Sequence, residues 1–270
     1  MDSRGVIKQM FGVERALIGV IHLDPLPGSP RAATSIDQIT AKAVDEARLF
    51  GDAGFHGLII ENMGDRPYLP RTVGPEVVAT MTAAGVAARS AVDLPLGVQV
   101  LAGANREALS VALAVGASFV RVEGFVFAHV ADEGIIESDA GELLRYRRAI
   151  GADHVAVFAD IKKKHSSHAL TADVDLAGTA EAAEFFLADG LVVTGTSTGQ
   201  PTSASDVATV SDRVSIPTLV GSGVNPDNVA DYRRADALIV GSFVKRDGLW
   251  SNNLDPERLS TMAAAFTATH

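Results

Sequence analysis

The stretch IPTLVGSGVNPDNV (216–229), followed closely by DALIVGSFVK (236–245), decides the fold of this chain. Each segment holds a short, nearly continuous apolar run that leads into a glycine-containing turn. Such runs are typical of strands buried on both faces, as in a parallel sheet. Six further runs of this kind come earlier in the chain: ALIGVIHL (16–23), FHGLIIEN (55–62), LPLGVQVL (94–101), ASFVRVEG (117–124), VAVFADIK (155–162) and GLVVTGT (190–196). The sequence therefore predicts eight strands.

Segments with helical spacing lie between these strands. In the first of them Ser35 is a suitable N-cap, apolar residues recur every three or four positions from Ile36 to Phe50, and Gly54 ends the pattern. Similar segments run over 75–91, 105–115, 138–149, 173–188, 203–212, 225–234 and 256–268. Eight strand–helix units in 270 residues predict a single-domain (β/α)8 TIM barrel over residues 1–270.

A doubly wound sheet is the alternative fold, because it shares the alternation of strands and helices. The first strand, however, runs into HLDPLPGSPRAATS (22–35) and not into a G-x-G-x-x-G turn. The sequence therefore has no nucleotide-cofactor signature, and the barrel is preferred.

The composition excludes several classes of function. The chain has no cysteine, so it has no disulfide, thiolate nucleophile or cysteine-based metal site. Its net charge of −10 argues against a nucleic-acid partner. No run approaches the roughly 20 apolar residues that span a bilayer, and the N-terminal segment lacks the apolar core of a signal peptide. We therefore expect a cytoplasmic protein without direct membrane insertion.

Polar residues gather where the predicted strands end, which is where barrels of this kind carry their chemistry. They are His22, Asp24, Glu61, Asn62, Gln99, Arg121, Glu123, Asp160, Lys162, Thr194 and Thr196. Residues two apart on a strand share a face. His22 is therefore expected on the same face as Asp24, Arg121 on the same face as Glu123, and Asp160 on the same face as Lys162. These side chains are expected to face the barrel axis, and the alternative is that some form structural ion pairs above the core.

The last two predicted strands carry a pattern that suits phosphate. Gly221 and Gly223 allow a ligand to approach the backbone closely, and Asn225 with Pro226 is expected to start a helix whose free amides favour an anion. Gly241 and Ser242 offer two further amides. Because phosphate often binds after strands seven and eight of such barrels, we predict a phosphate site here. The alternative is that the glycines serve only as turn residues.

The stretch IKKKHSSH (161–168) follows the fifth predicted strand. Lys162 is in phase with Asp160 and is expected to point toward the mouth, whereas Lys163 and Lys164 fit a surface charge run. His22 and Asp24 have a spacing that suits either a divalent metal or an acid/base pair. The sequence leaves the cofactor unknown and a divalent metal open.

Several longer motifs carry a family resemblance. VIHLDPLPGSPR (20–31), ENMGDRPY (61–68), FVRVEGFVFAHVADEGII (119–136), FADIKKKH (158–165), VVTGTSTGQPT (192–202), LVGSGVNPDNV (219–229) and IVGSFVKRDG (239–248) resemble the BtpA/SgcQ family. The resemblance covers nearly the whole chain in order. It implies a fold similar to the ribulose-phosphate-binding barrels. One branch of the family is named for the biogenesis or stability of photosystem I, and another lies among sugar-uptake and sugar-metabolism genes.

The chain departs from the family pattern at two places. Asn62, Met63, Gly64 and Asp65 stand where the family commonly reads NYGD or NFGD. The family's D-x-x-x-K-H spacing fits Asp160, Lys164 and His165, which leaves Lys162 as an extra lysine. Either Lys162 or Lys164 is then the functional one.

The leading hypothesis is an enzyme that acts on a phosphorylated sugar or a nucleoside-derived metabolite, by lyase, isomerase or glycosidic-bond chemistry. The strand-end carboxylates would move protons, while Arg121 and a lysine would stabilise negative charge. The expected catalytic set is His22, Asp24, Glu61, Asn62, Asp65, Arg121, Glu123, Asp160, Lys162, Lys164, His165 and Thr194.

The alternative, which the family resemblance implies, is a non-catalytic biogenesis or stability factor for a membrane complex such as photosystem I. A passive phosphate-sugar sensor is a third hypothesis, which the dense polar ring disfavours. Homo-oligomerisation is left open, with Trp250 either at an interface or closing the barrel's own helical layer.

Overall fold

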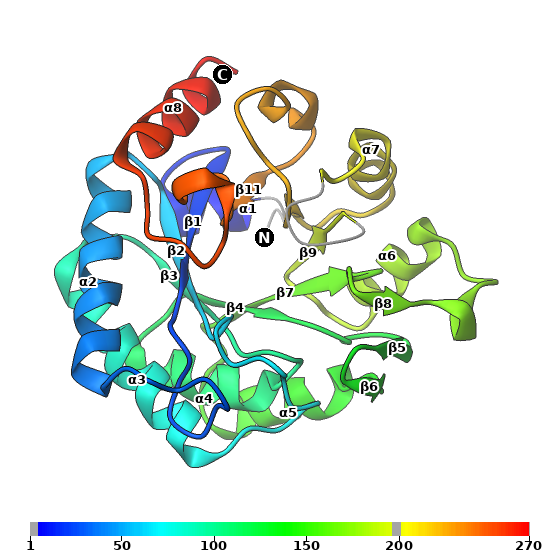
Figure 1. Ribbon diagram of the computed structural model, residues 1–270. Helices are drawn as coiled ribbons and strands as arrows, with labels where there is room; N and C mark the ends of the chain where they lie inside the picture. The colour runs from blue at the N-terminus through cyan, green and yellow to red at the C-terminus, as the bar shows by residue number, and fades with distance from the viewer. Residues whose placement is uncertain (1–4, 196–200, 270) are drawn as a thin grey trace.

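Eight parallel strands close into a barrel in the order β1-β11-β10-β9-β7-β4-β3-β2 (Figure 1). The structure, a computed structural model, describes residues 5–195 and 201–269. The barrel strands are β1 (Ala16–His22), β2 (Gly57–Glu61), β3 (Leu96–Gln99), β4 (Phe119–Val122), β7 (Ala156–Ile161), β9 (Gly190–Val193), β10 (Thr218–Val220) and β11 (Ala237–Val240). The predicted TIM barrel and its eight strands are confirmed.

Helices cover the outside of the barrel (Figure 1). They are α2 (Ile36–Asp52), α3 (Pro75–Ala91), α4 (Asn105–Val115), α5 (Ala140–Ala149), α6 (Leu176–Phe185), α7 (Ala204–Arg213) and α8 (Pro256–Thr267), with short 3-10 turns η1 (Ala169–Thr171), η2 (Val229–Tyr232) and η3 (Arg246–Gly248). The predicted N-cap Ser35 forms a capping box with Gln38: its hydroxyl accepts from the Gln38 amide, and the Gln38 side chain accepts from the Ser35 amide.

The helix predicted over 225–234 is wrong, because only the 3-10 turn η2 forms there. Asn225 Oδ1 accepts hydrogen bonds from the amides of Asp227 and Asn228, and Asn228 Oδ1 accepts one from the amide of Asn225. Such side-chain bonds to nearby amides compete with helical bonding. The amides that were expected to be free at this point therefore already have acceptors.

The core has two layers. Outside the strands, aliphatic side chains pack between barrel and helices, and Gly19 leaves room for the Phe50 ring of α2, which a Cβ at that position would meet at 2.4 Å. Inside the barrel, Ile18, Phe119 and Phe158 belong to a separate buried cluster. This inner cluster fills the lower barrel, so it forms a solid floor beneath the strand ends.

A helix that the sequence did not predict, α1 (Gly5–Phe11), closes the N-terminal end of the barrel. Its Ile7 and Phe11 are buried, and the Phe11 ring meets the Phe119 ring edge-on at 5.8 Å. Gly57, the first residue of β2, leaves space for Phe11. The C-terminal end of the barrel is therefore the end open to ligands.

A small antiparallel sheet lies beside that open end (Figure 1). It comprises β5 (His129–Ala131), β6 (Gly134–Ile136) and β8 (Ser166–Ser167), in the order β6-β5-β8. The β5–β6 hairpin is inserted between β4 and α5, while β8 follows β7. This sheet therefore links the loops of two neighbouring barrel strands. No helix among the described residues is both long and apolar enough to cross a membrane.

Candidate active site

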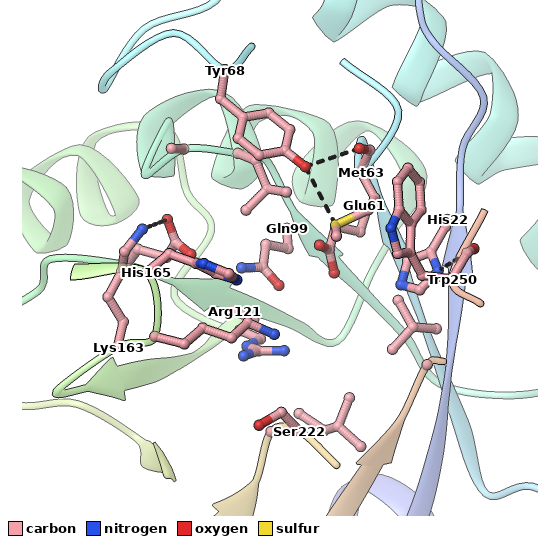
Figure 2. A pocket seen from close by; sticks show the side chains of 18 of the residues that line it. His22, Glu61, Met63, Tyr68, Gln99, Arg121, Lys163, His165, Ser222 and Trp250 are labelled. Atoms are coloured by element: carbon pink, nitrogen blue, oxygen red, sulfur yellow. Dashed lines mark hydrogen bonds and ion pairs between the residues drawn. The ribbon is translucent and has the colours of Figure 1, made fainter. Parts of the chain in front are cut away.

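A cavity of about 260 Å³ occupies the C-terminal mouth of the barrel (Figure 2). Ten of the residues predicted for the site line it: His22, Glu61, Arg121, Glu123, Lys164, His165, Gly221, Gly223, Gly241 and Ser242. They come from β1, β2, β4, β10 and β11 and from the segment after β7. The structure therefore gathers most of the predicted site in one place, at the size of one small metabolite.

The strand register explains why three side chains that line the cavity meet. His22 lies opposite Glu61 in the β1–β2 pair, and Glu61 lies opposite Gln99 in the β2–β3 pair. Paired residues of parallel neighbours point to the same side of a sheet. His22, Glu61 and Gln99 therefore form one row at the cavity floor.

Glu61 is only 8% exposed, and no hydrogen bond of its carboxylate is found among the described residues. Burial raises its pKa above the usual range, although the nearby charges of Arg121 and Lys164 oppose the shift. A carboxyl group with a raised pKa in a cavity can both take up and release a proton near neutral pH. Glu61 is therefore the best candidate for a general acid or base.

His22 is held as a neutral imidazole. Burial, followed by the charge of Lys245, lowers its pKa to about 3. Its Nδ1 lies 3.2 Å from the carbonyl oxygen of Trp250. A carbonyl can only accept, so Nδ1 carries the proton and Nε2 keeps a free lone pair. Nε2 lies beside Gly241, where an added Cβ would come within 3.1 Å of it.

Arg121 and Asp160 form a buried bidentate ion pair. Arg121 Nε lies 2.8 Å from Asp160 Oδ1, and the terminal nitrogen NH2 lies 3.0 Å from Oδ2. Burial alone would lower the pKa of Arg121, but Asp160 outweighs it and raises the pKa. The remaining nitrogen, NH1, has no partner among the described residues, and Arg121 lines the cavity. Asp160 thus orients the Arg121 guanidinium toward the mouth. The pair agrees with the alternative prediction that some of these residues form structural ion pairs.

The three lysines after β7 are placed differently from the prediction. The strand ends at Ile161, and Lys162 has a positive φ of 47°, which breaks the strand alternation. Lys162 Nζ therefore turns away and donates to the carbonyls of Val174 at 2.8 Å and Thr171 at 3.4 Å. The expectation that Lys162 points to the mouth in phase with Asp160 is wrong.

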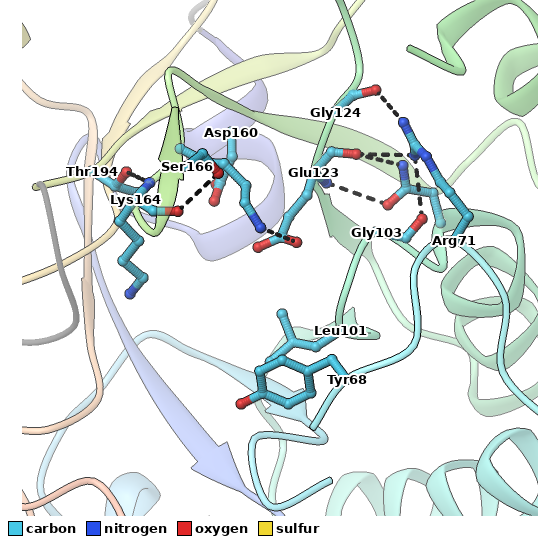
Figure 3. Close-up of polar contacts among 12 residues, drawn as sticks. Tyr68, Arg71, Leu101, Gly103, Glu123, Gly124, Asp160, Lys164, Ser166 and Thr194 are labelled. Carbon is cyan, nitrogen blue, oxygen red and sulfur yellow. Dashed lines mark hydrogen bonds and ion pairs between the residues drawn. The ribbon is translucent and has the colours of Figure 1, made fainter. Parts of the chain in front are cut away.

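Lys163 is not part of a surface charge run, as its sequence context suggested. It is 7% exposed, lines the cavity, and its Nζ lies 3.1 Å from Glu123 Oε2 (Figures 2 and 3). Burial pulls the pKa of Lys163 down, but Glu123 outweighs burial and the net shift is upward. Glu123 is therefore engaged by a cation and Lys163 is a site residue.

Lys164 also faces the cavity, which corrects its assignment to a surface charge run. Its backbone amide donates to the Thr194 hydroxyl (Figure 3), and no hydrogen bond or ion pair of its Nζ is found in the described part of the chain. Burial, together with Arg121, lowers its pKa. Between Lys162 and Lys164, only Lys164 lines the mouth cavity. Thr194 positions the lysine's backbone, while Thr196 lies outside the described residues.

The glycine-rich strand ends of β10 and β11 form one side of the cavity. Gly221 must be glycine, because a Cβ would meet Val192 at 2.5 Å and the Arg121 guanidinium at 2.9 Å. The backbone amides of Gly223 and Ser242 make no hydrogen bond within the described residues. Two donors without acceptors, in the same cavity as the Arg121 guanidinium, suit an anion.

Three predicted residues serve the loops around the cavity. Asp24 faces Lys42 of α2 and forms an ion pair there, so it does not join His22. Asn62 Oδ1 accepts from the Leu101 amide at 2.7 Å, and Asp65 Oδ1 accepts from the Leu26 amide at 2.7 Å. Asn62 and Asp65 thus fix the loops after β1, β2 and β3, away from the cavity.

Sequence reasoning missed an apolar wall made of Met63, Tyr68, Leu101 and Trp250, all of which line the cavity. Trp250 lies under Arg66, whose guanidinium carbon is 4.5 Å from the ring centroid, and edge-on to His22. Aromatic residues in the loops after two strands were a signal that could have marked this wall. Trp250 is therefore part of the mouth.

Sequence reasoning also missed Arg71, which clamps the loops of three strands. Its guanidinium donates to the carbonyls of Gly103, Glu123 and Gly124 (Figure 3). It also forms an ion pair with Asp139 at 2.9 Å. The spacing in the sequence gives no sign of this clamp, because its acceptors are backbone carbonyls.

No three histidine, aspartate or glutamate side chains of the described residues are placed to hold a metal ion together. The spacing of His22 and Asp24 in the sequence left a divalent metal open. In the structure Asp24 forms an ion pair with Lys42, and the two residues belong to no such group of ligands among the described residues.

The family model described as the BtpA family matches residues 13–268. The chain belongs to the BtpA family. An uncharacterised Caenorhabditis elegans protein, whose name includes the word mitochondrial, is 42% identical and covers 96% of each chain. A Synechocystis protein named photosystem I biogenesis protein BtpA is 36% identical over 96% of this chain and 90% of its own. Similar proteins thus occur in an animal and a cyanobacterium.

Solved structures show the same fold at low sequence identity. Thiamine phosphate pyrophosphorylase from Pyrococcus furiosus superposes with a TM-score of 0.57 at 16% identity, covering 95% of this chain and 96% of its own. Phosphoribosyl anthranilate isomerase from Thermus thermophilus gives 0.58 at 14% identity, with 94% and 100% covered. Both of these structural neighbours are TIM-barrel enzymes, and at such identities the likeness concerns the fold.

Proposed function

We propose that the protein is an enzyme that acts on a phosphorylated sugar or a nucleoside-derived metabolite by acid–base chemistry of the isomerase or lyase type. The observation that carries this proposal is one cavity in which a buried carboxyl group and an unpaired lysine lie close to amides without acceptors. A merely structural cluster would pair these groups, because an unpaired buried charge is costly.

The residues divide into two roles. The amides of Gly223 and Ser242 and the free nitrogen of Arg121 hold the phosphate. Binding energy from this end orients the rest of the molecule over the cavity floor. Glu61 then moves a proton at a carbon next to a carbonyl group, and Lys164 stabilises the negative charge that develops on the carbonyl oxygen.

His22 and Glu123 support this chemistry without competing for it. The neutral His22 presents Nε2 as an acceptor toward a substrate hydroxyl. The ion pair with Lys163 neutralises Glu123. Glu123 therefore positions the Lys163 ammonium group in the cavity and adds no uncompensated negative charge. Glu61 thus remains a carboxyl group at the cavity floor for which neither an ion pair nor a hydrogen bond is found among the described residues.

Ligand-dependent thermal stability tests the binding half of the proposal. Ribose 5-phosphate or ribulose 5-phosphate at 100 times its dissociation constant should stabilise the fold by about 2.7 kcal/mol, whereas free ribose should not. The series is run with and without a divalent metal. Gly241→Ala crowds His22 and should weaken the effect, while Gly141→Ala on α5 should preserve it.

Proton exchange tests the catalytic half. Each stabilising ester is incubated with the protein in heavy water and followed by NMR. The wild-type protein should exchange a carbon-bound proton, and Glu61→Gln should lose the exchange while it still binds the ester. If no phosphate ester stabilises the protein, the proposal fails, and the non-catalytic biogenesis role becomes the stronger hypothesis.

A further inference from the structure

Gln99 carries an acceptor that nothing in the described protein satisfies. The residue is 3% exposed at the end of β3, it lines the cavity, and its Oε1 is buried without a hydrogen-bond partner. Figure 2 shows its amide in the middle of the site, between Glu61 and His165. A buried polar atom without a partner is unfavourable. Gln99 Oε1 therefore needs a hydrogen-bond donor from outside the protein, either water or a ligand.

The cavity wall above Gln99 is apolar. Leu101 follows Gln99 by two residues, and Tyr68 lies against it in the loop after β2 (Figure 3). The Tyr68 hydroxyl donates to the Met63 carbonyl at 2.9 Å, and this bond fixes the plane of the ring. An aromatic face beside aliphatic side chains favours a flat, apolar partner.

The strand order places this wall across the barrel from the anion-binding side. In the closed sequence of strands, β3 is four places from β10 in either direction, which is the opposite position in a barrel of eight. A ligand whose phosphate lies at Gly223 therefore extends over Glu61 and Arg121 toward Gln99 and Tyr68. One end of such a ligand would contact backbone amides, and the other end would contact Gln99 and the apolar wall.

We infer that the substrate carries, at the end away from its phosphate, a planar nitrogen-containing ring of the nucleobase class, which lies on Tyr68 and Leu101 and donates an N–H to Gln99 Oε1. This inference rests on the proposed function, because it needs the phosphate at β10 and β11. It makes Gln99 a specificity-determining residue for the class of substrate.

Binding measured by titration calorimetry tests the inference with three probes: ribose 5-phosphate, uridine 5′-monophosphate and adenosine 5′-monophosphate. At least one nucleotide should bind the wild-type protein roughly tenfold more tightly than ribose 5-phosphate, since it adds a hydrogen bond and ring contacts. Gln99→Leu should bring that nucleotide back to the affinity of ribose 5-phosphate. Tyr68→Leu should also reduce the nucleotide preference.

The unliganded variant separates recognition from a structural role. Because Gln99 Oε1 has no partner in the described protein, Gln99→Leu should keep or raise the melting temperature of the free protein. A clear drop would show that the amide supports the fold, which would overturn the inference. Equal or weaker binding of both nucleotides by the wild-type protein would also overturn it, while binding of ribose 5-phosphate would leave the proposed function standing. If no phosphate ester binds, both fail.

Discussion

Replacing Asp160 with asparagine should destabilise the protein, although the two side chains have nearly the same shape. Asp160 accepts two hydrogen bonds from Arg121, at 2.8 and 3.0 Å, and both side chains are at most 5% exposed. The asparagine can accept only one such bond and carries no charge. The variant therefore leaves the Arg121 guanidinium buried with only part of its compensation.

The expected loss follows from the surroundings of Arg121. Breaking a buried ion pair by removing one partner typically costs about 3–5 kcal/mol. Glu61 and Glu123 still lie near the guanidinium and compensate part of its charge, so we expect the lower end, about 3 kcal/mol. An unfolding entropy of about 2.1 cal/mol/K per residue gives about 0.6 kcal/mol per degree for 270 residues. The melting temperature should then fall by about 5 °C.

Differential scanning calorimetry on purified Asp160→Asn measures this shift. Asp24→Asn is the matched control, because Asp24 pairs with Lys42 at a partly exposed position, where an ion pair contributes about 1 kcal/mol or less. The double variant Arg121→Met with Asp160→Leu should recover most of the stability and lose phosphate binding. A melting temperature of Asp160→Asn within about 1 °C of the wild type would show that Asp160 does not compensate the buried charge of Arg121.

Three further predictions concern ionisable groups at the mouth. The folded-state pKa of Glu61 is raised, so the wild-type protein loses stability as pH rises through that pKa; Glu61→Gln should be more stable than the wild type at about pH 8 and equal to it near about pH 4. Urea unfolding at both pH values checks this, and equal stability at the higher pH contradicts it. Lys163→Met leaves the buried Glu123 carboxylate without its ion-pair partner and should cost about 3 kcal/mol of stability. Lys162→Met loses only hydrogen bonds to carbonyls and should cost about 1 kcal/mol. Equal losses in chemical denaturation would contradict the different roles assigned to the two lysines. The imidazole of His22, whose pKa is lowered to about 3, should show no titration by NMR from about pH 5 to about pH 8, and a midpoint inside that range would contradict its description as a neutral acceptor.

Periodicity and strand-end position predicted the barrel and most of the mouth, because both depend on local pattern. Continuous apolar runs identified all eight strands, and the rule that polar residues follow them located His22, Glu61 and Arg121. Prediction failed where the chain leaves a regular element. The alternation of side chains along a strand predicts no orientation beyond Ile161, where β7 ends. The positive φ of Lys162 turns this residue away from the mouth, and Lys163 and Lys164 line the cavity in its place.

Other misses came from contacts between distant segments. Helix α1 is short, and its place depends on the space that Gly57 leaves for Phe11 and on the contact between Phe11 and Phe119. Asp24 was expected beside His22, but Lys42 of the next helix holds it. The helix expected from Asn225 was lost to bonds between two asparagine side chains and the backbone amides, which a helical pattern alone does not reveal.

A crystal structure of the protein with a stabilising phosphate ester tests the central claim most directly. The claim is that one cavity both anchors a phosphate and presents Glu61 to the carbon skeleton. We expect the phosphorus atom beside the amides of Gly223 and Ser242, with the remainder of the molecule over Glu61 and Lys164. A phosphate bound elsewhere, such as the neighbouring pocket lined by Lys162 and His168, with the mouth unoccupied, would contradict it.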